Sequence, residues 1–285
     1  MKIPFWKVQA VGNDFVLVHL DDFTDADRQL PDLARDVSRR RFGVGSDGLL
    51  ALGQESDRLR MRMFNPDGSE DFCGNGLRSA AAHAVIHGLV SGRAFDIAHL
   101  GHVVPAEVDD IEGHPSAKQV RTIIGTASFD PRSVPLTEGS QEKFETPLSV
   151  GDEVLEISSL TTGSTHTVIF VPELPADGRF EHLSQLLEHH PLFPERTSVI
   201  WVREPGSLEA ERLVIRIWER GAGETLGCGT GSSAAAAAWF RRTGRGGEIV
   251  VQNPGGDVRV EMARWDAPIA AASRAEEVFA GNLLG

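Results

Sequence analysis

Two short motifs with the same plan, one in each half of the 285-residue chain, constrain its fold more than any other feature. Cys73-Gly-Asn-Gly76 and Cys228-Gly-Thr-Gly231 each place a cysteine in a glycine-rich turn, and an alanine-rich segment follows each turn. Because alanine is the best helix former, we expect a helix to begin directly after each turn, the second one after Gly231. The unpaired N–H groups of a helix start can hold an anion, and this position also lowers the pKa of a cysteine.

The segments around the two motifs repeat as well. Strand, turn, strand, cysteine turn and helix occur once in each half, and the two cysteines are 155 positions apart. This repeat predicts two similar α/β domains, each with a sheet around one main helix. Proline and glycine positions favour further helices over residues 31–42 and 183–189.

Composition excludes several classes of function. A formal charge of −13 argues against nucleic acid, because phosphate binding needs a concentrated basic surface. The chain has no apolar run of the length that spans a membrane, and its first residues have no signal-peptide core. Two cysteines are too few for a disulfide scaffold. We therefore expect a cytoplasmic protein with reduced thiols and no membrane partner.

A pair of cysteines at two helix starts suits one reaction in particular. If both line a cleft, a small anionic substrate lies between two anion-binding groups, with one sulfur on each side. Inversion of a stereocentre requires a base and an acid on opposite faces, and a thiolate and a thiol can fill these roles. The carbanion needs electrostatic stabilisation in a site without water. Some enzymes use pyridoxal phosphate on a lysine, but the four lysines here lie in no site-like context, so a route without a cofactor is favoured.

Two other classes of function remain open from the residues alone. A cysteine hydrolase or transferase would use one cysteine with His166 and form a covalent intermediate. A protein that only binds an amino acid would hold it without exchanging its α-proton. The cysteines are also compatible with buried structural thiols or a redox pair, although no Cys-X-X-Cys spacing is present. We expect no metal site, because His189-His190 ends a helix in solvent and no other spacing is typical of ligands.

The motifs taken together resemble the diaminopimelate epimerase family, the two-cysteine amino-acid epimerases and racemases that work without a cofactor. The matching segments follow in order over nearly the whole chain, which makes the set specific although each glycine motif alone is weak. They are Gly12-Asn13-Asp14-Phe15, Gly43-Val-Gly-Ser-Asp-Gly48, Phe64-Asn-Pro-Asp-Gly-Ser-Glu70, Cys73-Gly-Asn-Gly76, Phe193-Pro-Glu-Arg196, Glu219-Arg-Gly-Ala-Gly-Glu-Thr225, Cys228-Gly-Thr-Gly231 and Pro254-Gly-Gly256.

This resemblance implies both a fold and an activity. The fold is α/β (α+β), with two pseudo-symmetric domains that each wrap a mixed or antiparallel sheet around a central helix. The first domain would comprise residues 1–117 and 270–285 and carry Cys73, and the second would comprise residues 118–269 and carry Cys228. The activity is conversion of LL-diaminopimelate to the meso form, in lysine and cell-wall precursor biosynthesis. A homodimer is usual for such enzymes.

The resemblance also implies roles for individual residues. Cys73 and Cys228 would form the acid/base pair. The donors that hold the reacting α-carboxylate would come from Gly74, Asn75, Gly229 and Thr230. Further substrate contacts would come from Asn13, Asn65, Glu219 and Arg220. His166 and Glu219 would adjust the acidity of the thiols and position the amino group of the substrate.

Two serines depart from the family pattern. Ser164 and Ser198 stand where the family has asparagines that read the far amino-acid end of diaminopimelate. A serine is shorter and cannot offer both an amide N–H and a carbonyl, so two lost contacts would cost a few kcal/mol of substrate binding. Either water and a shifted chain replace those contacts, or the enzyme is a racemase of a different amino acid.

Overall fold

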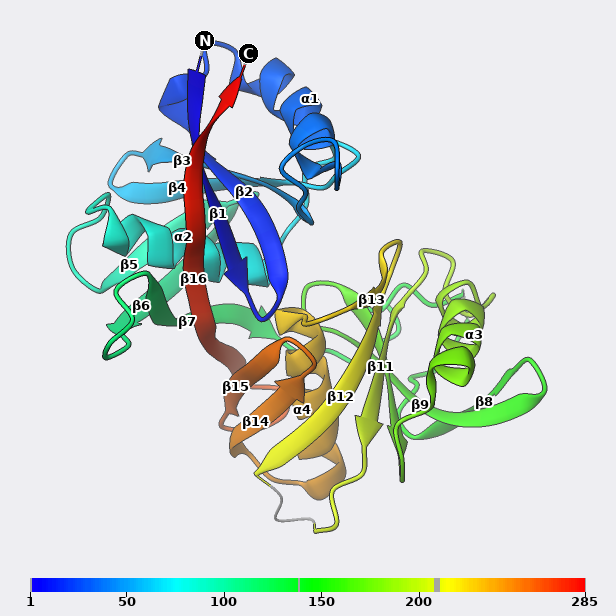
Figure 1. The fold of residues 1–285 in the computed structure, drawn as a ribbon. Helices are drawn as coiled ribbons and strands as arrows, with labels where there is room; N and C mark the ends of the chain where they lie inside the picture. Colours follow the sequence, from blue (N-terminus) through cyan, green and yellow to red (C-terminus); the bar gives the residue numbers. More distant parts are fainter. Residues whose placement is uncertain (1, 138, 208–210, 285) are drawn as a thin grey trace. The chain divides into compact units, whose positions relative to one another are not determined.

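The computed structural model describes residues 2–137, 139–207 and 211–284 of the chain (Figure 1). The chain divides into two compact units: unit 1 comprises residues 1–123 and 272–285, and unit 2 comprises residues 124–271. The chain passes into unit 2 within strand β7 (Ala117–Thr126) and returns within strand β16 (Pro268–Leu284). Gly285, the end of the segment assigned from sequence to the first domain, lies outside the described residues.

Unit 1 combines a sheet with two α-helices. Its strands besides β7 and β16 are β1 (Lys2–Ala10), β2 (Asn13–His19), β3 (Gly48–Glu55), β4 (Arg58–Phe64), β5 (Ala94–His99) and β6 (His102–Asp110). Its helices are the short 3-10 helix η1 (Leu20–Asp22), α1 (Ala26–Ser38) and α2 (Gly74–Ile86). The two ends of the chain lie side by side, because β1 pairs antiparallel with β16 (Figure 1).

Unit 2 has a corresponding set of elements. Its strands are β8 (Thr146–Val150), β9 (Glu153–Thr161), β10 (Thr165–Val171), β11 (Ser198–Arg203), β12 (Arg212–Glu219), β13 (Gly223–Thr225), β14 (Gly247–Asn253) and β15 (Gly256–Met262). Its helices are α3 (Asp177–Glu188) and α4 (Gly229–Thr243).

The two sheets are built on one pairing series, which confirms the internal repeat. In unit 1 the successive pairs from β1 to β6 are antiparallel, parallel, antiparallel, parallel and antiparallel. The pairs β9–β10, β10–β11, β11–β12, β12–β14 and β14–β15 of unit 2 follow the same order. Each parallel pair needs a crossover, and α1, α2, α3 and α4 lie in the four crossovers. The expected fold class is therefore confirmed.

The sheet of unit 1 buries both of its faces. Successive side chains of a strand point to opposite faces, and β2 shows the consequence. Phe15 and Leu17 belong to the core around α2, whereas Val16 and Val18 pack with the buried face of α1. This explains why residues 15–18 form an uninterrupted apolar run rather than an alternating pattern.

The two alanine-rich helices are enclosed by their units. In α2 every residue from Gly74 to Ala84 is buried, and in α4 the buried set includes every residue from Gly231 to Phe240. Small side chains on all faces allow strands to approach such a helix closely, and a helix that is apolar all round belongs in a core. The prediction of one central helix per domain is confirmed.

The predicted bounds of two other helices were wrong. The helix expected over residues 31–42 is α1, which begins at Ala26 and contains Pro31 in its sixth position. The predicted start was wrong because proline is favoured in the first turn of a helix. In the sixth position, Pro31 costs α1 one backbone hydrogen bond, and the burial of the apolar face of α1 offsets this loss. The helix expected over residues 183–189 is α3, which begins at Asp177. No helix in the described ranges is both long and apolar enough to cross a membrane.

Candidate active site

Cys73 lies at the N-terminus of the central helix of unit 1. It is the N-cap residue of α2, with extended backbone angles, and its Sγ accepts a hydrogen bond from the Gly76 N–H at 3.3 Å. A cap satisfies one of the unpaired donors of the first turn and leaves other N–H groups near the sulfur. The glycine-rich motif thus holds the sulfur at the positive end of the helix dipole.

Two asparagines predicted from the sequence meet at this cysteine. Asn13 Oδ1 lies 3.9 Å from Cys73 Sγ and also accepts a hydrogen bond from Asn75 Nδ2 at 3.3 Å. Asn75 is buried at the start of α2, and its Oδ1 accepts a hydrogen bond from the buried Arg78 guanidinium. The structure therefore gathers Asn13, Cys73, Gly74 and Asn75 into one cluster, the Cys73 site.

A polar group that sequence reasoning missed fixes Asn13. Asp47 Oδ2 accepts hydrogen bonds from Asn13 Nδ2 at 2.8 Å and from the Asp14 N–H at 3.0 Å. Asp14 forms ion pairs with Lys7 and Arg40, which lower the pKa of its carboxyl although burial acts against them. The available signal was the Gly43–Gly48 segment, in which Asp47 is the one charged residue.

Asn65 bonds within its own turn. Its side-chain Nδ2 donates to Ser69 Oγ at 3.1 Å, and its backbone N–H donates to the Ser69 carbonyl at 2.8 Å. The predicted Asn65–Gly68 turn is present, because the Gly68 N–H donates to the Asn65 carbonyl at 2.9 Å. The role of Asn65 in substrate binding stays a prediction.

Cys228 occupies the corresponding place in unit 2. It is the N-cap residue of α4, and its Sγ accepts a hydrogen bond from the Gly231 N–H at 3.4 Å. The Thr230 hydroxyl lies 3.3 Å from the same sulfur. Because Cys228 caps the helix, α4 begins at Gly229, three residues before the expected start. Among the described residues, neither Cys228 nor Cys73 takes part in a disulfide.

The expectation that a helix start lowers the thiol pKa was wrong for Cys228. Burial raises the pKa of the Cys228 thiol well above its ordinary value, and the negative charge of Glu219 acts in the same direction. Hydrogen bonds from Thr230 and the Gly231 N–H oppose this shift without reversing it. A thiolate in a buried, dry site beside a carboxylate is costly, so Cys228 holds its proton.

Glu219, Arg220 and Ser198 lie together beside this cysteine turn. Glu219 ends β12, and its Oε1 accepts a hydrogen bond from the Thr225 hydroxyl at 2.6 Å. The Arg220 backbone N–H donates to Ser198 Oγ at 3.1 Å, and its guanidinium donates to the Glu195 carbonyl at 3.1 Å. Ser198 therefore fixes the start of the Arg220 turn.

His166 is buried next to Ser198, because the two residues are register partners in the parallel pair β10–β11. Its Nδ1–H donates to the Ser164 carbonyl at 2.7 Å. Burial lowers the pKa of His166 to about 4, and the positive charge of Arg220 adds to the effect. The ring is neutral at neutral pH, with Nε2 as an acceptor. The group formed by Cys228, Thr230, Glu219, Arg220, Ser198 and His166 is called the Cys228 site below.

Two further residues hold the cysteine turn and were missed by the sequence analysis. Asn253 Oδ1 accepts hydrogen bonds from the Cys228 N–H at 3.4 Å and from the Ser232 hydroxyl at 3.2 Å. The Thr162 hydroxyl donates to the Thr230 carbonyl at 3.0 Å. Asn253 was visible only as the first residue of the hairpin turn at Pro254-Gly-Gly256, where asparagine is common for local reasons.

Comparison with known proteins identifies close relatives over the whole chain. The model of the family described as diaminopimelate epimerase matches residues 5–129 and 158–273. A diaminopimelate epimerase of Moorella thermoacetica is 38% identical over 282 residues, which cover 98% of this chain and 98% of the relative. One from Halothermothrix orenii is 32% identical over 293 residues, with 100% and 99% covered.

Solved structures share the fold at lower sequence identity. A phenazine biosynthesis protein of the PhzF family from Bacillus anthracis matches with a TM-score of 0.69 and 18% identity, covering 100% of both chains. A hydroxyproline epimerase from Agrobacterium vitis matches with a TM-score of 0.70 and 13% identity, covering 99% of this chain and 91% of that one. The family match and the full-length relatives confirm the resemblance found in the motifs: the chain belongs to the diaminopimelate epimerase family.

Proposed function

We propose that this chain interconverts LL- and meso-diaminopimelate without a cofactor, with Cys73 and Cys228 as the two acid/base groups. One observation carries the proposal: each unit presents one cysteine as the N-cap of its buried central helix, with the sulfur accepting the N–H three residues later. Two equivalent thiol groups are what a reaction that removes a proton from one face and returns one to the other needs.

The proposed chemical step moves two protons and no other group. A thiolate takes the α-proton of the substrate, and the carbanion then receives a proton from the thiol on the opposite face. The two cysteines have exchanged protonation states at the end, and the reverse reaction restores them. Burial raises the pKa of the Cys228 thiol, so we assign Cys228 as the acid in the direction of reaction in which Cys73 removes the α-proton.

The remaining residues bind and orient the substrate. We assign the α-carboxylate to the first N–H groups of α2 and α4, which also stabilise charge that develops on it in the transition state. Glu219 and Arg220 bind the ammonium and carboxylate groups, and Asn13 and Asn65 make further contacts. His166 is a neutral positioning residue, since its low pKa keeps the ring from taking up a second proton at neutral pH.

The two serines are compatible with diaminopimelate as the substrate. Ser198 has a place in the site, because its hydroxyl fixes the Arg220 backbone. The carbonyl of Ser164 fixes the buried His166 ring. Both positions therefore support the site through hydrogen bonds that do not depend on an asparagine side chain, and the relatives named for diaminopimelate support the same substrate.

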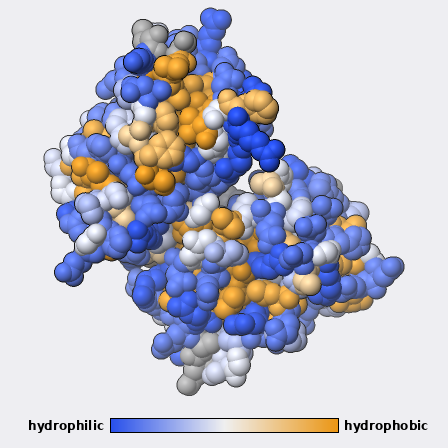
Figure 2. Space-filling view, in the orientation of Figure 1, coloured by the Kyte–Doolittle hydropathy of each residue, from blue (hydrophilic) through white to orange (hydrophobic). Residues whose placement is uncertain are grey.

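We also propose that the enzyme is a cytoplasmic homodimer. Figure 2 shows apolar side chains gathered over β1 and β16 on one face of unit 1. Val278, Phe279 and Leu284 of β16 are exposed by 56%, 49% and 84%. Apolar side chains exposed to this extent are typical of an interaction surface. Sedimentation of the intact chain tests the dimer, and a monomer at all concentrations would contradict it.

The decisive experiment follows the α-proton by NMR in D2O. The reduced chain, without pyridoxal phosphate, is given LL-diaminopimelate, and parallel samples contain lysine, histidine, glutamate and serine. We expect loss of the α-proton signal and appearance of the meso isomer with diaminopimelate alone. The Cys73→Ser and Cys228→Ser variants should each lose interconversion by about 10²–10⁴-fold, because a serine hydroxyl is a poor acid and a poor base at neutral pH.

Other outcomes point to other functions. Exchange with only another amino acid would mean that Ser164 and Ser198 mark a changed specificity. Full activity in either single variant would contradict the two-base reaction and favour a hydrolase or transferase that uses one cysteine. Tight binding without exchange would indicate an amino-acid binding protein.

A further inference from the structure

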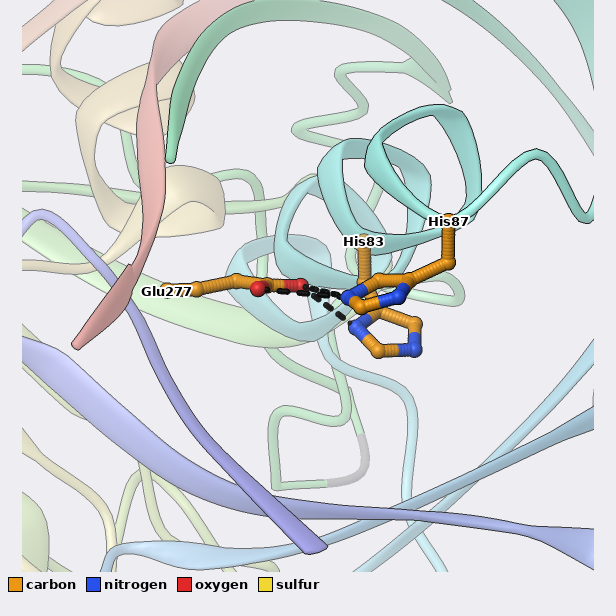
Figure 3. A group of neighbouring side chains, drawn as sticks. All are labelled: His83, His87 and Glu277. Atoms are coloured by element: carbon orange, nitrogen blue, oxygen red, sulfur yellow. Dashed lines mark hydrogen bonds and ion pairs between the residues drawn. The ribbon is translucent and has the colours of Figure 1, made fainter. Parts of the chain in front are cut away.

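Two histidines and one glutamate, His83, His87 and Glu277, lie close together in unit 1, at the opposite end of α2 from Cys73. His83 lies in the last turn of α2 and His87 is its C-cap residue, four positions later, so the two side chains lie on one side of the helix end. Glu277 comes from β16, and one ligand atom from each of the three side chains lies within 4.8 Å of the others. Figure 3 shows both imidazole rings reaching from α2 toward the Glu277 carboxylate.

The three side chains already converge through hydrogen bonds. His83 Nδ1 lies 2.6 Å from Glu277 Oε1, and His87 Nε2 lies 3.0 Å from Oε1 and 3.3 Å from Oε2 of the same carboxylate. The His83 side chain is fully buried, Glu277 is 15% exposed and His87 is 33% exposed. The cluster is therefore anchored in the core and open to solvent on one side.

We propose that His83, His87 and Glu277 bind a divalent transition metal ion, with zinc as the best match. Two imidazoles and one carboxylate form a ligand set that suits zinc, and the exposed side leaves a position for water. Ligand atoms of a tetrahedral zinc ion with bonds of about 2.0–2.2 Å lie about 3.3–3.6 Å apart, so the observed separations of 2.6 and 3.0 Å would widen by roughly 0.3–1.0 Å on binding.

Neighbouring side chains provide the hydrogen bond and the ring contacts that orient a histidine ligand. His19, the last residue of β2, places its Nε2 2.9 Å from His83 Nε2. With a metal on Nδ1, His83 carries its proton on Nε2 and donates it to His19, which fixes the tautomer and the ring orientation. The ring of Trp6 stacks on His19 with centroids 4.8 Å apart and meets His83 edge-on at 4.8 Å, so these rings have a defined place.

The proposed ion is structural and separate from the proposed reaction. Ten residues of helix separate His83 from Cys73, which is about 15 Å along the axis of α2. The ion would connect α2 to β16, two elements that are 190 residues apart in sequence at His87 and Glu277. This proposal departs from the expectation drawn from the sequence, where His189-His190 was placed at a solvated helix end and no other spacing was typical of metal ligands.

The test measures metal binding by the intact reduced chain in equilibrium dialysis against zinc. We expect one ion per chain and a melting temperature that rises with zinc concentration. Because His83 is fully buried, the variants are His87→Gln and Glu277→Gln, which should lose the ion while keeping the far-ultraviolet circular dichroism and the epimerisation rate. The outer-layer variant His19→Gln should bind about 10–100-fold more weakly.

A matched control and a second probe separate this site from other ligands. His189→Gln with His190→Gln removes the adjacent histidine pair of unit 2 and should leave binding unchanged. Cobalt should quench Trp6, the one tryptophan of unit 1, and its absorption should show no thiolate charge-transfer band. Trp6→Phe should lose the quenching but keep the ion.

Three results would overturn the proposal. The first is the absence of stoichiometric binding by the folded chain. The second is binding that persists in both His87→Gln and Glu277→Gln, which would place the ion elsewhere. The third is a cobalt thiolate band, which would assign the ion to a cysteine. Each result would leave the proposed epimerase reaction untouched, because that reaction is read by proton exchange without added metal.

Discussion

The second glycine of each cysteine motif is a position where one added methyl group should slow the reaction. A Cβ built on Gly76 would lie 3.0 Å from Leu50 Cδ2 and 3.5 Å from Cys73 Sγ. A Cβ on Gly231 would lie 2.9 Å from Ile200 Cδ1 and 3.5 Å from Cys228 Sγ. The contact with the sulfur is an ordinary van der Waals contact in both units, whereas the contact with Leu50 or Ile200 is too close. Either that aliphatic side chain gives way, or the helix start shifts and takes the cysteine with it.

The cost to folding should be small, whereas the cost to the reaction should be large. Overpacking in a well-packed core costs about 1–3 kcal/mol, and replacing a helical glycine by alanine returns about 0.5–1 kcal/mol. We therefore expect Gly76→Ala and Gly231→Ala to be destabilised by about 0–2.5 kcal/mol. A displacement of a reacting group by about 1 Å costs on the order of 10²-fold in rate.

The assay is the kcat for loss of the α-proton, measured beside the melting temperature. Gly178→Ala is the matched control, because it adds the same methyl to a helix of unit 2 with nothing within 4 Å of the new Cβ. It should retain the wild-type kcat and gain a little stability. Wild-type rates in Gly76→Ala or Gly231→Ala would refute the reasoning, since the sulfur position would then not depend on the glycine.

Three further predictions test the charges and hydroxyls of the Cys228 site. Glu219→Gln should lower the pKa of Cys228 and speed its alkylation at a given pH, as read by peptide mapping, whereas Glu224→Gln should leave that rate unchanged. The pKa of His166 is 6.5 in the unfolded chain and about 4 in the folded chain. As the pH drops between these two values, the unfolded chain therefore takes up a proton that the folded chain does not. Stability should therefore be lost over that window by about 3 kcal/mol, and denaturation of His166→Gln should show a flatter pH dependence; an equal slope would contradict the shift. Ser198→Asn should lower the KM for diaminopimelate by about 2–12-fold if the amide adds one hydrogen bond of about 0.5–1.5 kcal/mol, and an unchanged KM would show that this position does not reach the substrate.

The elements that carry strong local signals were predictable from the sequence. The alanine runs after Cys73 and Cys228 gave two helices, because high helix propensity and a glycine-rich turn agree there. The repeat of strands around them predicted two similar units, and the pairing series of β1–β6 and β9–β15 confirms it. Local propensity and long-range pairing point to the same answer in these segments.

The positions that depend on tertiary contacts were not predictable in the same way. Nothing in the local sequence separates Asp47, which holds Asn13, from an ordinary turn residue. The pKa of Cys228 was expected to fall at a helix start and instead rises, because the burial of residue 228 is set by the whole unit. The local sequence predicts the helix dipole, which lowers the pKa of the Cys228 thiol. The burial that raises this pKa more strongly is known only from the folded chain.

The pairing of β1 with β16 has a consequence for the order in which the protein forms on the ribosome. Lys2 pairs with Leu284, so β1 receives this partner from residues that are synthesised 282 positions later. At about 5–20 residues per second, that partner arrives roughly 14–56 seconds later. Unit 2 is a continuous segment and can fold during this interval, whereas one edge of β1 stays open to other chains until β16 has been made.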